Sequence, residues 1–531
     1  MKVFTRMLFA VLLAACLLPA ALAQEPSTLR IGSTYPIDTL NPANGYYGYN
    51  LRPLWYDTLI LWAGRDRFEP GLATDWSVSE DGLTWTFTIR EGVTFHDGTP
   101  LTAAEIAWNI NWILENEVPS FITYMVNVEG AEAPDATTLL VTVSAPVPDM
   151  ISAKFLYVWM LPPHIWQGMD YDTLTSYSEL DATLGSGPYR LTEYREGEFM
   201  IMEAYADYWA GPPPVERIIV REYATADALA QALLAGEIDF VYSLPASTTF
   251  ALAGAPNIAL VTGEGFTFEE LIINSSPRGT QPASLNDPAV RRAIAHSVDK
   301  QSINTVAYLG YALPGVALLP PGMGAFHHDQ LVDYAYDLTE ANRILDEAGF
   351  VDSDNDGVRE YSDGTPLSYR LYAPESESYY ARIIEIIAAD LAQVGIATDP
   401  QILADDSLIA LQPTYDNDLI YWGWNLDPDP TFTLSIMTCA ETVEGGWSDS
   451  GYCNEEYDAL FAAQSTSTDP EARRQIIWQM QEIVHEDLPY VITAYVQALN
   501  AYRSDRFTFH PDLASQPLRW ALYDGFAVAG N

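Results

Sequence analysis

Hydrophobic and polar residues follow two different periods along the chain, so the sequence predicts both strands and helices. Residues Thr84–Arg90 alternate with a period of two, which indicates a half-buried strand, and Thr138–Val143 shows the same pattern. Thr102 and Glu105 form a capping box before apolar residues at helical spacing, which predicts a helix that runs to Leu114. Strands and helices are interspersed without a low-complexity linker, so we expect an α/β fold.

Helix start and stop signals are frequent in the rest of the chain. Asp287 and Asp469 each precede a proline, which combines an N-cap side chain with proline at the first helical position. Three further helical patterns end at a glycine, as helices often do. These patterns cover residues 226–235, 340–348 and 378–394.

The first residues predict export. Lys2 and Arg6 precede the apolar run Met7–Leu18, and a small-residue pattern predicts cleavage after Ala23. A lipid-anchored form through Cys16 is the alternative, but the residues that follow Cys16 stay apolar where lipoproteins become polar. No second apolar run approaches 18 residues, so we expect the mature chain not to span a membrane. It would act in the periplasm or at the cell surface.

Composition narrows the class of protein. The 531 residues contain 72 Asp and Glu against 25 Lys and Arg, a net charge of −47, so nucleic acid is not an expected partner. Hydrophobic residues make up 48% of the chain, which is typical of a packed globular protein. After signal cleavage two cysteines remain, Cys439 and Cys453. In an oxidising compartment they predict one disulfide, with two free thiols as the alternative.

Short sequence blocks occur in a fixed order along nearly the whole mature chain. They are Pro70–Trp76, Asp81–Phe87, Arg90–Gly92, Phe95–Pro100, Gly185–Tyr189, Ala235–Asp239, Asn286–Ile294, Ala341–Phe350, Trp422–Trp424 and Asp427–Pro430. In this order they resemble the bacterial extracellular solute-binding proteins of family 5, the peptide, nickel and oligosaccharide receptors of ATP-binding-cassette (ABC) importers. The resemblance implies a two-lobed clamshell of the type II periplasmic-binding-protein kind, with an extra inserted subdomain.

The same resemblance implies the domain organisation and the mode of action. Ligand would sit between the lobes, and the closed form would be accepted by the membrane permease. The implied parts are a signal peptide (1–23), lobe one (24–57, 185–275 and 496–531), an inserted subdomain of lobe one (58–184) and lobe two (276–495).

The block around Trp422, Trp424 and Asn425 carries the first candidate ligand site. In peptide-binding relatives an aspartate three positions after a tryptophan pairs with the ligand's α-ammonium, and Asp427 has this spacing from Trp424. A buried cation needs an opposite charge, and an aromatic wall adds cation–π attraction. The alternative is a solvated Asp-Pro turn.

Three tyrosines form the second candidate, because the resemblance places the segment after the first strand in the cleft. Tyr46, Tyr47 and Tyr49 lie beside Gly45 and Gly48, a spacing that fits neither a strand nor a helix. Their rings would offer flat amphipathic surfaces to a ligand, with core packing as the alternative.

The ligand class is narrowed by one departure from the family pattern. Dipeptide-binding members place an arginine for the ligand carboxylate before the helix predicted at 378–394, and Tyr372–Glu375 contains none. Longer peptides, held by main-chain hydrogen bonds, and oligosaccharides, held by stacking, are both compatible with this. His327 and His328 are adjacent and cannot easily face one nickel ion, so a solvated loop is expected there.

An acidic loop resembles a calcium-binding pattern. Asp352, Asp354 and Asp356 occupy its positions 1, 3 and 5, with Glu360 nearby and Asp363 at position 12. The interpretation is a structural Ca²⁺ site, and the alternative is an acidic surface turn.

The functional prediction is an exported receptor, not an enzyme. It would capture an oligopeptide-like ligand by lobe closure, deliver it to an ABC permease, act as a monomer and need no cofactor besides the possible Ca²⁺. An oligosaccharide or nickel-complex receptor of the same fold is the alternative. A secreted hydrolase is the alternative from another class, but the chain has no G-x-S-x-G or H-E-x-x-H motif.

Overall fold

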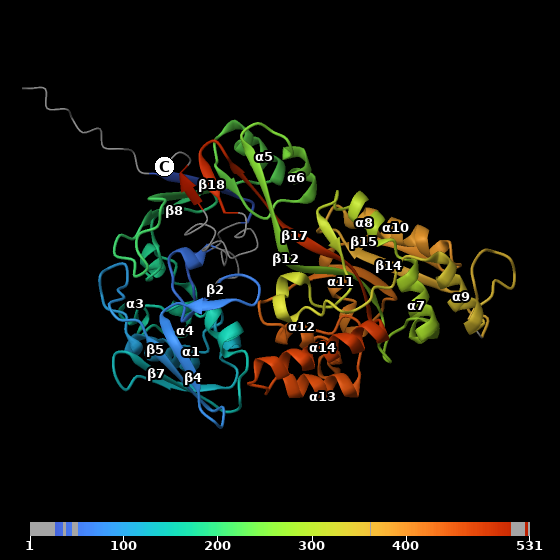
Figure 1. The fold of residues 1–531 in the computed structure, drawn as a ribbon, viewed down its shortest axis with the longest axis horizontal. Coiled ribbons are helices and arrows are strands. Elements are labelled where there is room, and N and C mark those ends of the chain that lie inside the picture. The colour runs from blue at the N-terminus through green and yellow to red at the C-terminus, as the bar shows by residue number, and fades with distance from the viewer. Residues whose placement is uncertain (1–26, 36–38, 45–50, 362, 511–525, 529–531) are drawn as a thin grey trace, which may run out of the picture.

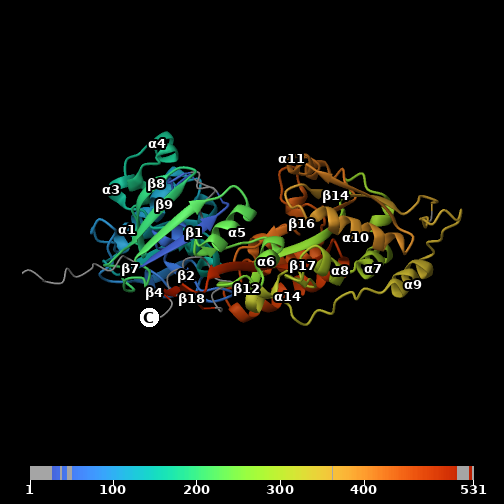
Figure 2. The ribbon, with the colours of Figure 1, turned by 90° about the horizontal axis from the view of Figure 1, so that it is seen from above.

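The computed structural model describes residues 27–35, 39–44, 51–361, 363–510 and 526–528. It has two bodies joined by two long strands, β12 (Ile258–Ile273) and β17 (Tyr490–Arg503), and Figures 1 and 2 show these strands running between the bodies. The predicted α/β class and two-lobed arrangement are confirmed. The predicted signal peptide, with Cys16 and Ala23, lies outside the described residues.

The two long strands pair with each other in both bodies. They are antiparallel, and the register shifts between Gly263 and Thr267. On one side of this shift, Val261 packs into the core of the first body; on the other, Phe268 packs into a core of the second body. The link is therefore a two-stranded ribbon with an interruption in its ladder.

The interruption requires a glycine. A Cβ atom on Gly265 would lie 1.8 Å from the carbonyl oxygen of Val496, and one on Gly322 would lie 2.4 Å from that of Gly265. Gly322 belongs to η6 (Pro321–Phe326), a 3₁₀ segment of the second body. Three segments thus meet at the crossing at a distance that excludes side chains.

One sheet extends through both bodies. In the first body β17 is followed by β11, β1, β10, β9 and β8, and in the second β12 is followed by β16, β14 and β15. The bounds in the first body are β11 (Phe240–Val241), β1 (Thr28–Ser33), β10 (Arg217–Glu222), β9 (Phe199–Ala204) and β8 (Tyr189–Arg195). In the second they are β16 (Leu419–Asn425), β14 (Ser368–Pro374), β15 (Ala397–Leu403) and β13 (Ala312–Pro314), which pairs with β17.

The first body also holds a separate four-stranded sheet, in the order β4 (Ala73–Val78), β5 (Thr84–Ile89), β7 (Thr138–Val143) and β6 (Val128–Glu132). Both strands predicted from alternation, β5 and β7, are present. Helix α1 (Ala103–Asn116) packs on this sheet and begins with the predicted capping box at Thr102 and Glu105. Two further two-stranded antiparallel sheets pair β2 (Ile60–Trp62) with β3 (Phe68–Pro70) and β18 (Phe507–Phe509) with β19 (Phe526–Val528).

The helices begin and end close to the predicted signals. Asp287 and Asp469 cap α7 and α14, and Gly236 and Gly349 end α5 and α9. Helix α10 is shorter than the predicted 378–394 by two residues at each end. In the first body the helices besides α1 are α2 (Phe155–Tyr157), α3 (Pro163–Trp166), α4 (Tyr171–Ser176), α5 (Ala226–Ala235) and α6 (Ala246–Leu252). In the second they are α7 (Pro288–Ser297), α8 (Lys300–Val306), α9 (Leu338–Ala348), α10 (Tyr380–Ala392), α11 (Asp405–Ile409), α12 (Thr431–Ser435), α13 (Glu455–Gln464) and α14 (Pro470–Asp487).

Two sequence expectations about covalent structure and membrane topology can be compared with this fold. The predicted disulfide between Cys439 and Cys453 is confirmed, with Cα atoms 4.4 Å apart. Among the described residues, no helix has the length and apolar character that crossing a membrane requires.

A buried carboxyl lies in the second body on β12. Glu269 is 2% exposed and accepts hydrogen bonds from the hydroxyls of Tyr308, Tyr379 at 2.9 Å and Tyr421 at 3.1 Å. Burial raises the pKa of Glu269 from 4.5 to about 7, although the tyrosine hydroxyls oppose the shift. The side chain is therefore held by donors from the residue before α10, from β16 and from the loop after α8.

This pKa shift predicts a pH-dependent stability. Between pH 4.5 and 7 the folded protein holds the Glu269 proton that the unfolded chain releases. The stabilisation that Glu269 gives the folded state is therefore largest below pH 4.5 and is lost as pH rises to about 7. This pKa shift corresponds to a loss in the free energy of unfolding on the order of 3 kcal/mol. We expect a lower free energy of unfolding at pH 8 than at pH 5 in urea titrations, and a weaker pH dependence in Glu269→Gln. An unchanged pH dependence in the variant would contradict this assignment.

Candidate functional site

The two bodies contact each other beside the linking strands. Trp62 at the β2–β3 hairpin packs edge-on against Phe266 of β12, with ring centroids 4.8 Å apart. The backbone N–H of Ala325 in η6 donates to the carboxylate of Asp66 at 3.0 Å. The hairpin thus lies against the crossing.

A buried ion pair forms a second contact between the bodies. Asp429 is 2% exposed, and Arg473 of α14 binds it through two hydrogen bonds of 2.8 Å. The hydroxyl of Ser152 in the first body donates to the same carboxylate. Burial alone would raise the pKa of Asp429, but the charge and hydrogen bonds of Arg473 hold it at about 2. The Asp-Pro-Asp-Pro block is therefore more than a solvated turn, because its second aspartate anchors the contact.

The predicted tryptophans lie on β16, which pairs with β12. Trp422 and Trp424 are half-buried, and the indole N–H of Trp424 donates to Asp449 at 3.1 Å. The ring of Trp424 also lies edge-on to the exposed ring of Phe432, with ring centroids 6.3 Å apart. Asn425 is exposed, and its side-chain oxygen accepts a hydrogen bond from Thr267 at 2.6 Å.

Asp427 lies in the turn after β16, two residues before the ion-paired Asp429. It is exposed to solvent, and yet its pKa is raised, first by partial loss of water around the carboxyl and then by the charge of Asp429. A carboxylate that is both reachable and partly surrounded by protein is suited to accept a cation. The structure places it beside the contact that Ser152 makes with Asp429.

The predicted tyrosines Tyr46, Tyr47 and Tyr49 lie outside the described residues. Nearby in sequence, Tyr35 of the first body stacks with Tyr242 at a centroid distance of 6.4 Å. The pKa of Tyr35 is raised by burial and by the negative charge of Glu377, which belongs to the second body. The sequence did not predict that Tyr35 and Glu377 lie near each other, because no local pattern connects two residues so far apart in the chain.

The adjacent histidines have separate partners. His327 is within 2.6 Å of the carbonyl oxygen of Leu319, whereas His328 contacts the carboxylate of Glu482 at 3.1 Å. The two imidazoles therefore do not converge on one position.

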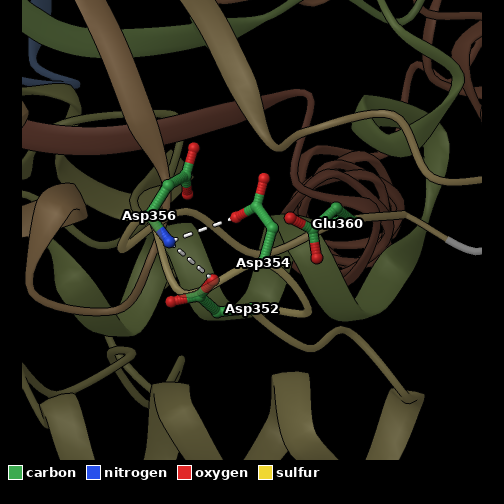
Figure 3. A group of neighbouring side chains, drawn as sticks. All are labelled: Asp352, Asp354, Asp356 and Glu360. Atoms are coloured by element: carbon green, nitrogen blue, oxygen red, sulfur yellow. Dashed lines mark hydrogen bonds between the residues drawn. The ribbon is translucent and has the colours of Figure 1, made fainter.

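Four of the five residues predicted to bind calcium come together on the surface. Asp352, Asp354, Asp356 and Glu360 have potential ligand atoms within 4.8 Å of one another (Figure 3). The backbone N–H of Asp356 donates to Asp352 and Asp354, both at 3.1 Å, which closes the loop. Asp363 lies outside this group and accepts a hydrogen bond from its own turn, so calcium at this loop stays a prediction.

Comparison with known proteins identifies the family. Residues 67–444 match the model of the bacterial extracellular solute-binding proteins, family 5. The chain belongs to this family. It is 24% identical over 495 residues to the glutathione-binding protein GsiB of Salmonella typhi, covering 91% of each chain. It is also 24% identical over 526 residues to the di/tripeptide-binding protein 2 of Pseudomonas aeruginosa, covering 94% of this chain and 95% of the relative.

Solved structures show the same fold. The ABC transporter substrate-binding protein CtaP of Listeria monocytogenes superposes with a TM-score of 0.80 at 22% identity, over 95% of this chain and 100% of that one. The clamshell expected from the sequence blocks is therefore confirmed, and the bodies are the two lobes of a family 5 solute-binding protein. The residue bounds predicted for the lobes stay a prediction.

The buried Asp429–Arg473 ion pair predicts that two substitutions at this lobe contact destabilise the protein to different extents. Asp429→Asn leaves Arg473 without its counter-charge, so we expect a loss of about 3–5 kcal/mol in the free energy of unfolding. Ser152→Ala removes one hydroxyl donor and should cost about 1 kcal/mol. Urea unfolding would measure both, with Glu198→Gln as a control at an exposed ion pair worth under about 1 kcal/mol. A cost for Asp429→Asn no larger than the control would contradict the importance of this pair.

The calcium prediction is tested by metal analysis and melting. If the loop binds Ca²⁺, adding the ion should raise the melting temperature, EDTA should reverse the rise, and Asp354→Asn should abolish it. Asp363→Asn is a matched control, because Asp363 lies outside the group. If no metal is bound and the melting temperature does not shift, the calcium site is rejected and the loop is an acidic surface turn.

Proposed function

We propose that this family 5 protein captures an oligopeptide-like solute between its lobes and delivers it unchanged to the permease of an ABC importer. The observation that carries the proposal is the exposed Asp427, placed beside half-buried Trp424 and the lobe contact at Asp429. A peptide's α-ammonium would pair with the Asp427 carboxylate, and the raised pKa of this group indicates a site where water screens the pairing less than in bulk solution.

The relatives support a peptide as the solute. GsiB is named as a glutathione-binding protein, and the relative from Pseudomonas aeruginosa as a di/tripeptide-binding protein. The arginine that would hold a short ligand's carboxylate is not found at Tyr372–Glu375. Arg370, two residues earlier, is engaged by Asp416 and Asp418 at 2.8 and 2.9 Å. We therefore propose peptides longer than two residues, held partly through their main chain.

Lobe closure is the proposed mode of capture. The lobes are joined by the β12–β17 ribbon, whose ladder is interrupted between Gly263 and Thr267, and rotation at this interruption would bring the facing surfaces together. We also propose that the protein acts as a monomer outside the cytoplasm, in keeping with the extracellular family to which it belongs.

Calorimetric titration of Ala-Ala-Ala-Ala and its N-acetylated form tests the proposal. The free peptide should bind at least tenfold more tightly than the acetylated one, which is about 1.4 kcal/mol, because acetylation removes the charge that Asp427 would pair. Asp427→Asn should remove the difference, whereas Asp399→Asn, at an exposed position of β15, should retain it. Mass spectrometry should recover the peptide intact, and X-ray scattering should show a smaller radius of gyration on binding.

Two outcomes would overturn the proposal. Equal affinity for the free and acetylated peptides would remove the role of Asp427. Cleavage of the peptide by the purified protein would favour the hydrolase instead of the receptor.

A further inference from the structure

A second buried glutamate lies beside Glu269, on the opposite face of β12. Glu270 is 0% exposed and is paired across the sheet with Trp422 of β16 and Ile492 of β17. Neither of its carboxyl oxygens has a hydrogen-bond partner among the described residues. Glu269, in contrast, is saturated by three tyrosine hydroxyls. The strand thus carries one satisfied and one unsatisfied buried acid.

A second carboxyl lies on the same side of the sheet as Glu270. Asp449 is 2% exposed and accepts hydrogen bonds from the indole of Trp424 and the hydroxyl of Tyr490. Both donors belong to the apolar cluster that also contains Phe268, Trp422 and Ile492. The negative charge of Asp449 adds to burial in raising the pKa of Glu270 well above its ordinary value. The two acids therefore share one environment behind the tryptophans of β16.

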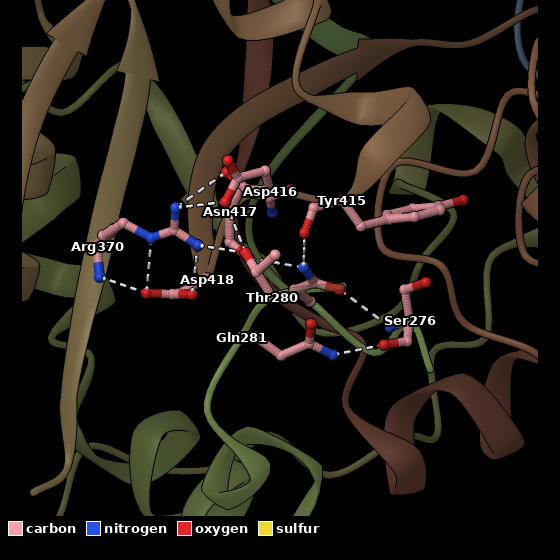
Figure 4. Close-up of polar contacts among 9 residues, drawn as sticks. Ser276, Thr280, Gln281, Arg370, Tyr415, Asp416, Asn417 and Asp418 are labelled. Carbon is pink, nitrogen blue, oxygen red and sulfur yellow. Dashed lines mark hydrogen bonds and ion pairs between the residues drawn. The ribbon is translucent and has the colours of Figure 1, made fainter. Parts of the chain in front are cut away.

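Two buried aspartates of the second body, Asp418 and Asp429, have arginine partners within the chain. Arg370 binds Asp418 at 2.9 Å, as Figure 4 shows, and Arg473 binds Asp429 at 2.8 Å. Within the described ranges, Glu270 and Asp449 form no ion pair with lysine, arginine or histidine. These two acids therefore lack a counter-charge from the part of the chain that the structure describes.

A buried carboxyl without a partner is costly, because it loses its hydration and gains no hydrogen bond. The cost can be reduced in two ways: the group takes up a proton, or a cation from outside occupies the space beside it. An aromatic neighbour favours the cation, since indole faces attract positive charge, and Trp422 is the cross-strand neighbour of Glu270. A chain with a net charge of −47 also attracts cationic solutes.

We propose that Glu270 and Asp449 bind the ammonium or guanidinium side chain of a basic residue in the captured peptide, with Trp422 and Trp424 as the aromatic walls. This inference rests on the proposed function, in which Asp427 holds the peptide's amino terminus. Trp424 connects the two positions, because its indole contacts Asp449 and the chain reaches Asp427 three residues later. The arriving cation would replace this indole hydrogen bond.

The test is a calorimetric comparison of lysine with norleucine, which has a side chain of similar length without the charge. The probes are Ala-Ala-Ala-Ala and four variants with lysine at each position in turn, each matched by its norleucine analogue. We expect at one position at least tenfold tighter binding of lysine than of norleucine. Glu270→Gln and Asp449→Asn should each reduce this ratio, and Glu269→Gln, on the opposite face, should retain it.

Proton release gives a second readout that a purely structural role would not produce. If Glu270 is protonated in the free protein, binding the lysine peptide should release a proton, which titrations in buffers of different ionisation enthalpy detect. The titratable groups that interact electrostatically with Glu270 are Asp449, Glu269, Tyr380 and Tyr490. The release should fall in Glu270→Gln and persist in Glu269→Gln.

The outcomes separate this inference from the proposed function. Binding of Ala-Ala-Ala-Ala with equal affinities for lysine and norleucine at every position would overturn the acidic pocket and leave the peptide receptor intact. A lysine preference that persists in both Glu270→Gln and Asp449→Asn would also overturn it. No binding of any probe would overturn both. Because the lysine–norleucine comparison uses the unmodified protein, it decides the matter even if a variant fails to fold.

Discussion

The pairing of β12 with β17 is the constraint on which the other features depend. Backbone N–H and C=O groups buried in either lobe must be hydrogen-bonded, and a shared two-stranded ladder satisfies them while the chain passes from one core to the other. The ladder is interrupted where the cores change, between Gly263 and Thr267, and its register shifts again between Glu269 and Glu270. At that point Gly265 lets the carbonyl of Val496 approach closely. A larger residue there would separate the strands where the lobes need a common axis.

The candidate binding residues follow from this ribbon. Strand β16 pairs with β12 on the side away from β17, so Trp422 and Trp424 are held next to the crossing, and the turn after β16 carries Asp427 toward the other lobe. The ion pair of Asp429 with Arg473 then fixes this turn to α14, and Ser152 ties it to the first lobe. A ligand bound at Asp427 would therefore contact a turn that is held by both lobes.

Local sequence patterns predicted the parts of this arrangement that local physics decides. The capping box at Thr102 and the Asp-Pro start at Asp287 are present because a cap depends on neighbours within one turn. The resemblance supplied Asp427 and Trp424. It did not predict the hydrogen bond from Ser152 to Asp429, since these residues are 277 positions apart. Nor did it predict the burial of Glu270, which depends on Trp422 and Ile492 in other strands.

Glu270 also illustrates where sequence rules and folded structure disagree. A glutamate inside an apolar strand contradicts the pattern that places Phe268 and Ile272 in the core on the same face. Folded proteins concentrate such local conflicts at functional sites, because a group that is unsatisfied in the free protein can be satisfied by a ligand. The adjacent Glu269 is buried equally well but has its donors, so burial alone does not mark a site. What distinguishes Glu270 is the combination of burial, a second acid nearby and the lack of a counter-charge among the residues that the structure describes.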